Sequence, residues 1–419
     1  MGSSLKKRPG VAKATAADAP TACALQLAAI GLEAEFTLLV NDRQVRPEAL
    51  FADPRAFLRG PLMHRQGTSY HIPTGGAVYF DTGVIEVATP VIEIERGCAP
   101  RAGRSLWEAI RFVRDGLDQW ERRAGKRARL AGFSTHYNVS FDLPGCDRGQ
   151  QRTVEKLARL LAYILPVPVM LLAANRRSTG IGVRPRGDRI EVTADFTPSS
   201  SLMIATATFI TGVVREVMRW PSFEEEMLRA MNVPVIAGYQ PMPHTSRKGH
   251  LARFDCYPRN PFTADIDAPD WKVRLAPDAT GEQWPMLSLR DVARHIYRRF
   301  YRAVARLSDP FTYRLISSVF AGRAPSLLDL EDRPASYEDV GRLCRWENLF
   351  PERLLGRSRY EQVLIHAIAG RKLRVDGARL QPTGMRGWSQ VVFRREGGGA
   401  QLVFSIDSLL DRLEDWERP

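Results

Sequence analysis

The chain has 419 residues, of which 44% are apolar and 26% charged, and this composition is typical of a globular protein rather than a disordered or fibrous one. No uninterrupted apolar run approaches the roughly 20 residues of a membrane-spanning helix, so the sequence gives no sign of a membrane protein. The formal net charge of +13 favours an acidic partner, although arginines scattered over solvated helix faces would give the same total.

The first predicted elements are strands. Residues 1–26 are small, basic and polar, and they predict a disordered tail rather than a signal peptide. Residues 27–40 read as a strand. Residues 41–75 are rich in turn formers, with a short helical piece around Pro47–Leu58, and residues 76–95 read as two strands or one bent strand.

Helices and strands then alternate. A helix carries Leu106 to Trp120, a strand covers 129–142, and a helix from Val154 to Ile164 stops at Pro166 and Pro168. A strand then covers Arg189–Asp195, a serine-rich cap at Ser199–Ser201 opens a helix to about Trp220, and a long helix carries Val292 to Leu307. This order predicts an α+β fold in which helices cover one face of a mainly antiparallel sheet.

Two structured regions are expected after the tail. Residues 27–324 are expected to form one large domain. Residues 325–419 form a small C-terminal domain, with two short helical patterns, a strand at Lys372–Val375, a turn at Gly397–Gly399 and a strand at Gln401–Ile406.

The five cysteines are odd in number and far apart, without a CxxC pair. This usage indicates a reducing cytoplasm and supports neither a disulfide framework nor a zinc site.

Acidic residues alternate with apolar ones in two strand-like runs. Glu33 and Glu35 lie two residues apart, on one strand face, and Tyr79, Asp81 and Glu86 follow in the second run. Carboxylates aligned on one face repel each other unless a cation lies between them, and such oxygen ligands suit Mg²⁺, which usually accompanies phosphates. The alternatives are an edge strand with two solvated acids and, for Asp81, a turn aspartate before Thr82 and Gly83.

Two further groups of polar residues accompany the acids. His136, Asn138 and Ser140 share one face of a predicted strand, which favours a ligand or a water, although a lone histidine is more often structural. Arginines at 184, 186 and 189, with Glu191 and Asp195, could hold a γ-phosphate or only solvate a loop. The chain has no Walker A, GxGxxG, HExxH or GxSxG motif, so phosphate handling would depend on acids, arginines and magnesium.

These motifs, in this order, resemble the glutamine synthetase-like carboxylate–amine ligases, and most closely the Pup ligase and depupylase family. The similarity covers about residues 29–220. The matching segments are Gly31–Phe36, Gly75–Asp81, Ile85–Pro90, His136–Asn138, and Arg189–Asp195 followed by Ser199–Ile210. The resemblance implies a curved, mainly antiparallel glutamine synthetase-like sheet with ATP and Mg²⁺ as cofactors.

The resemblance also implies roles for single residues. Glu33, Tyr79 and Glu86 would bind magnesium, Asp81 would be the catalytic carboxylate, Thr89 would contact ATP, and Trp388 is the candidate for a tryptophan near the nucleotide. To these we add Glu35 as a metal ligand, Arg189 as a catalytic residue, and His136, Asn138, Arg186 and Glu191 in the ATP site.

The sequence departs from that family at several places. Ala77 stands where the family has an arginine that contacts ATP, and Ile85 replaces a proline. The stretch between Ala173 and Arg189 is shorter, and the depupylase insertion after the first strand is absent, which favours a ligase.

The predicted function is therefore an ATP- and Mg²⁺-dependent ligase that joins a carboxylate to an amine through an acyl phosphate. Its expected partners are an acidic peptide or small protein carrying the carboxylate, and an amine such as a lysine side chain. Two alternatives stay open: a depupylase-like amide hydrolase that uses bound nucleotide, and a non-catalytic basic module that binds nucleic acid. The rows of acids argue against the second.

Overall fold

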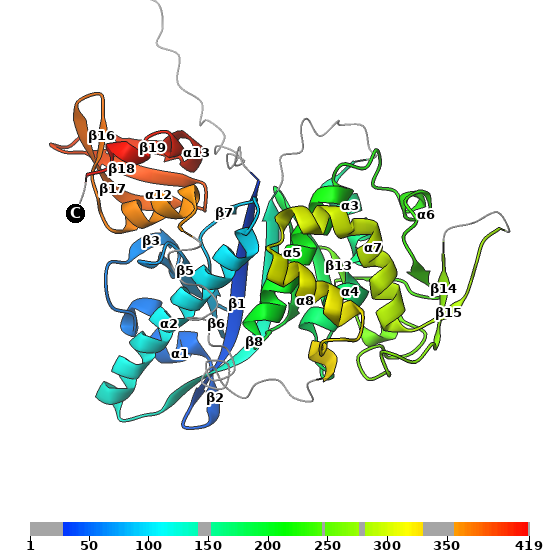
Figure 1. The fold of residues 1–419 in the computed structure, drawn as a ribbon. Helices are drawn as coiled ribbons and strands as arrows, with labels where there is room; N and C mark the ends of the chain where they lie inside the picture. Colours follow the sequence, from blue (N-terminus) through cyan, green and yellow to red (C-terminus); the bar gives the residue numbers. More distant parts are fainter. Residues whose placement is uncertain (1–27, 141–151, 245–247, 276–280, 330–355, 418–419) are drawn as a thin grey trace, which may run out of the picture.

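The computed structural model describes residues 28–140, 152–244, 248–275, 281–329 and 356–417, so the tail predicted at 1–26 lies outside the described residues. Segments in which apolar and polar residues alternate form strands, and these strands pair into one large antiparallel sheet (Figure 1). Across the described residues the sheet has 12 strands, in the order β12 (Met242–Pro243), β13 (His250–Ala252), β9 (Ile181–Arg186), β10 (Arg189–Asp195), β8 (Ala128–Ser140), β1 (Ala29–Val40), β6 (Val84–Ala88), β5 (Ala77–Asp81), β4 (Ser69–His71) and β3 (Met63–Gln66), with β2 (Arg43–Val45) and β7 (Ile92–Glu93) also paired to β1.

Strand β1 shows how the sheet separates its two faces. Leu32, Ala34 and Phe36 are fully buried on one face, whereas Glu33 and Glu35 lie between them on the other. A strand turns successive side chains to opposite sides, so the alternation read from the sequence fixes which residues reach the helices. We call the two sides the helix face and the site face.

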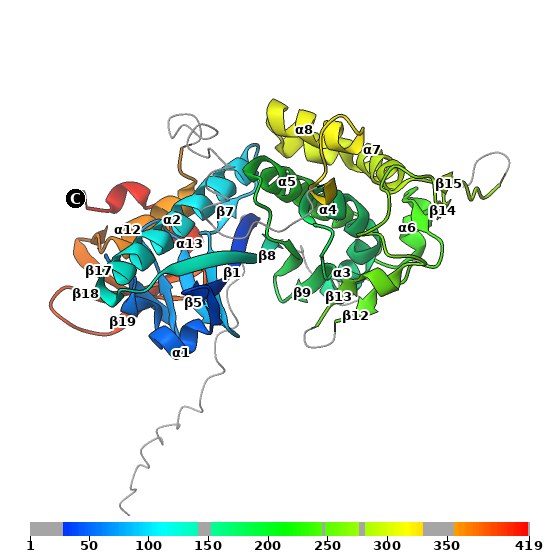
Figure 2. The same ribbon diagram turned by 90° about the horizontal axis from the view of Figure 1, so that it is seen from below.

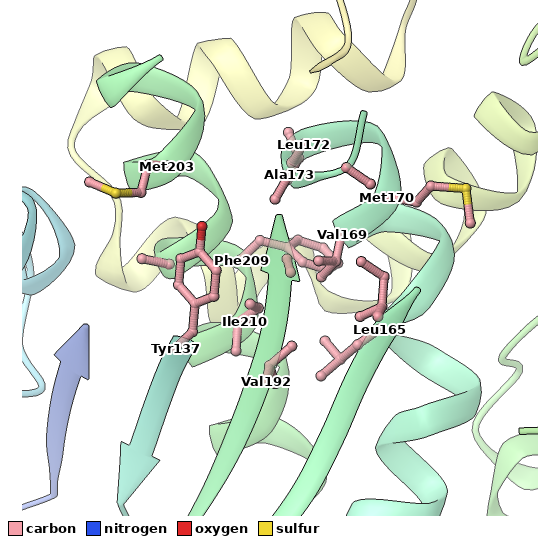
Figure 3. Packing of buried hydrophobic residues seen from close by; sticks show 14 of the residues in the cluster. Tyr137, Leu165, Val169, Met170, Leu172, Ala173, Val192, Met203, Phe209 and Ile210 are labelled. Atoms are coloured by element: carbon pink, nitrogen blue, oxygen red, sulfur yellow. The ribbon is translucent and has the colours of Figure 1, made fainter. Parts of the chain in front are cut away.

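Helices cover the helix face. They are α2 (Cys98–Ala124), α3 (Val154–Ile164), α4 (Pro166–Ala173), α5 (Ser200–Val217), α7 (Leu289–Leu307) and α8 (Pro310–Phe320). Figure 2 shows α7 and α8 as an outer layer packed on α4 and α5. Close to the sheet, Tyr137 and Val192 of the strands meet Phe209 and Ile210 of α5 (Figure 3). The predicted α+β class, with helices on a mainly antiparallel sheet, is confirmed.

Helix α5 has the length and composition of a membrane span, as does the bent pair of α3 and α4 taken together. However, 83% of the tested window of α5 is buried inside the protein. Its apolar residues are therefore accounted for by packing in the core.

The predicted helix from Val154 stops before Pro166 as expected, but a second helix that the sequence did not predict follows it directly. Helix α3 ends at Ile164, and α4 begins at Pro166 at an angle of 63° to it. Proline is well tolerated in the first turn, because the backbone N–H that it lacks would have no partner inside the helix. The prolines therefore bend the path of the chain into a second helix.

The remaining elements of the larger part are short. They are α1 (Pro47–Phe51), α6 (Glu226–Ala230), the 3-10 helices η1 (Pro54–Ala56), η2 (Phe254–Cys256) and η3 (Leu327–Asp329), and a separate three-stranded sheet of β11 (Val235–Ile236), β14 (Trp271–Arg274) and β15 (Met286–Leu287). The sequence did not predict β3, β4, β9 or α8. Cys98 and Cys256 are buried and free.

Residues 356–417, here called the C-terminal unit, have their own apolar cluster, which Ala29 and Met63 of the large sheet join. The unit contains α12 (Arg359–Ile368), the four strands β16 (Leu373–Val375), β17 (Ala378–Arg386), β18 (Gln390–Arg395) and β19 (Gln401–Ser405), then α13 (Ile406–Leu410) and η4 (Leu413–Asp415). In Figure 1 it lies in orange and red beside β3. Leu327 and Leu328 still pack in the larger core, so that core extends past the predicted boundary at 324, and residues 330–355 lie outside the described residues.

A buried glutamate fastens the C-terminal unit to α2. Glu361 is fully buried, accepts a hydrogen bond of 2.5 Å from the Ser105 hydroxyl, and lies 3.3 Å from the Arg104 guanidinium. Removing one partner of such a buried pair is strongly destabilising, by about 3–5 kcal/mol. The unit is therefore held in a defined position relative to the large sheet.

Candidate active site

The register of the central strands places the predicted acids in rows across the site face. Tyr79 lies opposite Glu86, Glu86 opposite Glu35, and Glu35 opposite Ser134 on neighbouring strands. In the next row, Glu33 lies opposite His136. Four strands, β5, β6, β1 and β8, thus supply side chains to one patch, and the acids that the sequence placed on common strand faces do converge.

His136 is the centre of this patch. Its Nδ1 lies 3.3 Å from Glu33 Oε2 and 4.0 Å from Glu86 Oε1, and its Nε2 lies 3.5 Å from Glu35 Oε1. All four side chains are largely withdrawn from water, which makes their uncompensated charges costly. We call Glu33, Glu35, Asp81, Glu86 and His136 the acid cluster.

Asp81 joins the cluster on the β5 side. Carboxylate oxygens of Glu35, Asp81 and Glu86 lie within 4.8 Å of one another, and so do those of Glu33 and Glu86 with a ring nitrogen of His136. The Tyr79 hydroxyl donates a hydrogen bond of 2.6 Å to Glu86 Oε1. Tyr79 is thus bonded to a cluster carboxylate, and its pKa is raised well above the usual value, first by burial and then by Glu33 and Glu86.

The protonation of the cluster reflects its crowding. Burial, followed by the charge of Glu33, raises the pKa of Glu86. Burial acts in the same sense on Glu33, but hydrogen bonding and charge from His136, and the charge of Arg189, outweigh it and lower the pKa of Glu33. Burial alone would lower the pKa of His136, yet its bond to Glu33 and the charges of Glu35 and Glu33 raise it. The patch therefore favours a positive charge at its centre.

The donor set fits a divalent cation. Carboxylate oxygens are the ligands preferred by Mg²⁺ and Mn²⁺, and Glu35, Asp81 and Glu86 offer them from three adjacent strands. In the second group, Glu33 and Glu86 are accompanied by the imidazole of His136, a ligand type that suits transition metals. A cation at either position would relieve the repulsion that raises the pKa of Glu86.

Three arginines lie beside the cluster on β9 and β10; Arg184 is buried, whereas Arg186 and Arg189 are partly exposed. Arg186 donates to both oxygens of Glu191, at 2.7 and 3.1 Å, and Arg184 forms an ion pair with the same carboxylate. Glu191 is therefore paired with two guanidinium groups and holds both arginines in position. This pairing leaves its carboxylate oxygens little capacity to bind a ligand. Arg189 instead donates a hydrogen bond of 2.9 Å from Nε to the Asn138 amide oxygen. Its Nη1 donates a second hydrogen bond, of 3.1 Å, to Asp188.

Two cavities reach the acid cluster on the site face. The first has a volume of about 1050 Å³ and meets the cluster at Glu35, Asp81 and His136. Its wall also carries Arg46, Arg184, Asp195 and Arg253, with Phe133 and Phe254 exposed beside them. This cavity can therefore accommodate a ligand with both apolar and charged groups.

The second cavity has a volume of about 870 Å³ and meets the cluster at Glu33. It is lined by Thr89, Asn138, Arg189 and, from the C-terminal unit, Trp388. The Thr89 hydroxyl accepts a hydrogen bond of 3.0 Å from the Leu32 amide, so it also supports the wall of the cavity. Three guanidinium groups line the same space, those of Arg65, Arg189 and Arg386.

Two residues that the sequence did not single out pack on Trp388: Arg65, which also lines this second cavity, and the fully buried His71. The Arg65 guanidinium lies 4.6 Å from the ring centroid of Trp388, and the ring of His71 meets Trp388 at 4.9 Å and 90°. Arg65 lies on β3 and His71 on β4, in a stretch that the sequence predicts to be turn-rich. Arg65 had no neighbouring motif to mark it, and only the pairing of these strands brings it to the site.

The predicted site residues are thus gathered on one face, but with different environments. Glu33, Glu35, Tyr79, Asp81, Glu86 and His136 form one patch; Thr89, Asn138, Arg189 and Trp388 line the cavity beside it; Arg186 and Glu191 are paired with each other. Their roles as metal ligands, ATP contacts and catalytic groups stay predictions.

No model of a known protein family matches the chain, and no curated protein matches it in sequence. Among solved structures, the chain is similar to one titled "Crystal structure of the complex between Prokaryotic Ubiquitin-like Protein Pup and its Ligase PafA". The sequence identity is 10%, the match covers 93% of each chain, and the TM-score is 0.43. Because this likeness is so weak, the function proposed below depends on the geometry of the site.

Proposed function

We propose that this protein is an ATP- and Mg²⁺-dependent carboxylate–amine ligase with a glutamine synthetase-like catalytic sheet. The supporting observation is the acid cluster, which lies where two cavities meet the site face. A protein that only bound nucleic acid would gain nothing from buried, mutually repelling carboxylates. An enzyme that must place a polyphosphate and a second substrate at shared metal ions requires such an arrangement.

The second cavity is the proposed nucleotide site, because its arginines lie next to the acids. Glu33, Glu35, Tyr79 and Glu86 would hold Mg²⁺, which when bound supplies charge neutralisation for phosphoryl transfer. Thr89, Asn138 and Trp388 would position ATP, with His136, Arg186 and Glu191 supporting the same face. Arg189 would neutralise charge on the transferred group, since its guanidinium lines this cavity beside Glu33.

The first cavity is the proposed site for the carboxylate and the amine. The substrate carboxylate takes the γ-phosphoryl group of ATP and gives an acyl phosphate and ADP. The amine then attacks the acyl carbon, phosphate leaves, and Asp81 accepts the proton that the amine loses. Arg46 and Arg253 supply positive charge on the cavity wall, which supports a carboxylate-bearing peptide or small protein as substrate.

The test is ADP release measured with panels of carboxylates and amines, in wild type and in Asp81→Asn. We expect release that depends on both substrates in wild type, and a large loss of turnover with retained Mg-ATP binding in the variant. Turnover equal to that of wild type would remove Asp81 from this role.

The same assay separates the alternatives. A ligase forms one ADP for each amide bond made, whereas a hydrolase of the depupylase type would cleave amides without consuming nucleotide stoichiometrically. Salt-dependent binding of RNA or DNA, together with no affinity for Mg-ATP, would instead favour the basic binding module.

A further inference from the structure

Arg65 occupies an irregular position in the sheet. The pairing of β3 with β4 shifts between His64 and Gln66, so Arg65 is the extra residue of a β-bulge. A bulge locally redirects a side chain that a regular strand would turn elsewhere. Here the side chain of Arg65 lines the second cavity together with Glu33 and Trp388.

The guanidinium of Arg65 lies between two aromatic rings. Its central carbon is 4.6 Å from the ring centroid of Trp388 and 5.7 Å from that of Tyr79. Tyr79 is bonded to Glu86 in the acid cluster, and Trp388 lies in the turn that joins β17 to β18. Arg65 therefore bridges the acid cluster and the C-terminal unit.

This guanidinium has no carboxylate partner among the described residues. Its polar contact there is a hydrogen bond of 3.4 Å from Nη1 to the Ser69 hydroxyl, and its buried Nε has no partner. An arginine side chain is always charged in proteins, and a withdrawn charge without a counter-ion is costly. Glu33 and Glu86 act on it electrostatically, but these are the carboxylates that metal ions would engage.

Resting on the proposed function, we propose that Arg65 binds the polyphosphate of the nucleotide, and that Trp388 holds Arg65 in place instead of stacking on the base. A planar guanidinium with free N–H groups matches phosphate oxygens, and Arg189 and Arg386 line the same cavity. The face of Trp388 that Arg65 covers is not open to a base, and His71 packs perpendicular to the same ring. The C-terminal unit thereby becomes part of the phosphate site.

The experiment compares Mg-ATP with inorganic Mg-tripolyphosphate, which lacks the base, by isothermal titration. Arg65→Gln should weaken both ligands by the same factor, roughly 10- to 100-fold, as expected for loss of one charged hydrogen-bond partner. Arg65→Lys keeps the charge without the fork and should give an intermediate loss. Trp388→Ala should weaken tripolyphosphate as well as ATP, and Trp388→Phe should recover much of the affinity, because it keeps an aromatic face for the cation.

Arg394→Gln is the matched control, since it removes one exposed positive charge from β18 and does not line the cavity. Each outcome decides a separate point. If wild type binds neither ligand, the proposed function fails. If wild type binds Mg-ATP and both Arg65 variants bind as tightly, the role of Arg65 is refuted. If Trp388→Ala weakens ATP but not tripolyphosphate, Trp388 contacts the base, contrary to our proposal.

Discussion

The two faces of the central sheet are chemically opposite. On the helix face of β1, Phe36 is fully buried and its ring packs 5.1 Å from that of Phe196. On the site face of the same strand, Glu35 is only 7% exposed and lies among other acids. Burial of Phe36 stabilises the fold through the hydrophobic effect, whereas burial of Glu35 opposes folding unless a counter-charge is present.

This difference teaches how to separate structure from function within one strand. Residues of the helix face should affect stability and leave the chemistry of folded molecules intact. The carboxylates of the acid cluster on the site face should affect binding and turnover, with stability unchanged or improved in the absence of ligand. Substitutions on the two faces should therefore differ in which property they change.

The first prediction concerns the helix face. Phe36→Ala should lower the free energy of unfolding by about 3–5 kcal/mol, because it removes a buried ring and leaves a cavity against Phe196. Urea unfolding measures the change. The molecules that stay folded should bind Mg-ATP as tightly as wild type does. A loss of Mg-ATP affinity without a loss of stability would contradict the claim that the helix face contributes to stability and not to binding.

The second prediction concerns the acid cluster. Glu86→Gln should reduce ATP turnover by roughly 10²–10³-fold, the range seen when one strong electrostatic group is removed from an active site. The melting temperature in EDTA should not fall, because the variant loses repulsion from Glu33 and Glu35. A variant that is clearly less stable yet fully active would show that Glu86 is structural.

The third prediction uses His71, on β4, whose pKa is lowered to about 3, first by burial and then by the charge of Arg65. In the unfolded chain the pKa is near 6.5, so the unfolded state binds more protons between these values. Stability should therefore fall as the pH drops from 6.5 toward 3. Unfolding of wild type and His71→Asn at pH 7.5 and pH 5 isolates this term, and an identical pH dependence of the two proteins would refute it.

The fourth and smallest effect is expected at Thr89. Thr89→Ala leaves the Leu32 amide without its hydroxyl acceptor, which should lower the free energy of unfolding by about 1–2 kcal/mol. Thr89→Ser keeps the acceptor and should recover most of the loss. Equal stability of both variants and wild type would mean that this hydrogen bond contributes little.

Much of the central sheet was predictable because alternation is a local property. β1, β8 and β10 were placed from apolar and polar residues at every second position, and β5 and β6 from the run around Glu86. The N-cap of α5 was also predicted from the serines before the helix. In the structure Ser199 is the cap, and its side chain accepts a hydrogen bond from the Leu202 amide. The convergence of the acids followed from these faces once the strands paired.

Other features depend on pairing that the sequence does not display. β9 carries Pro185 and Gly182 and reads as a loop, yet it pairs with β10 and brings Arg184 to Glu191. Arg65 reaches the site through a bulge, and Trp388 reaches Arg65 only because the C-terminal unit packs beside β3. Such long-range contacts, and the pairing of Arg186 with Glu191, leave no periodic signal in the chain.

The most direct test of the central idea is the thermal unfolding of wild type and Glu86→Gln in EDTA, in Mg²⁺, and in Mg²⁺ with ATP. Ligands that bind only the folded state raise the melting temperature, by an amount that grows with the logarithm of the ligand concentration divided by Kd. The wild type should be stabilised most by Mg²⁺ and ATP together, and the variant should lose that increment. An unchanged melting temperature in wild type, or the same increment in Glu86→Gln, would contradict the assignment of the acid cluster to metal and nucleotide binding.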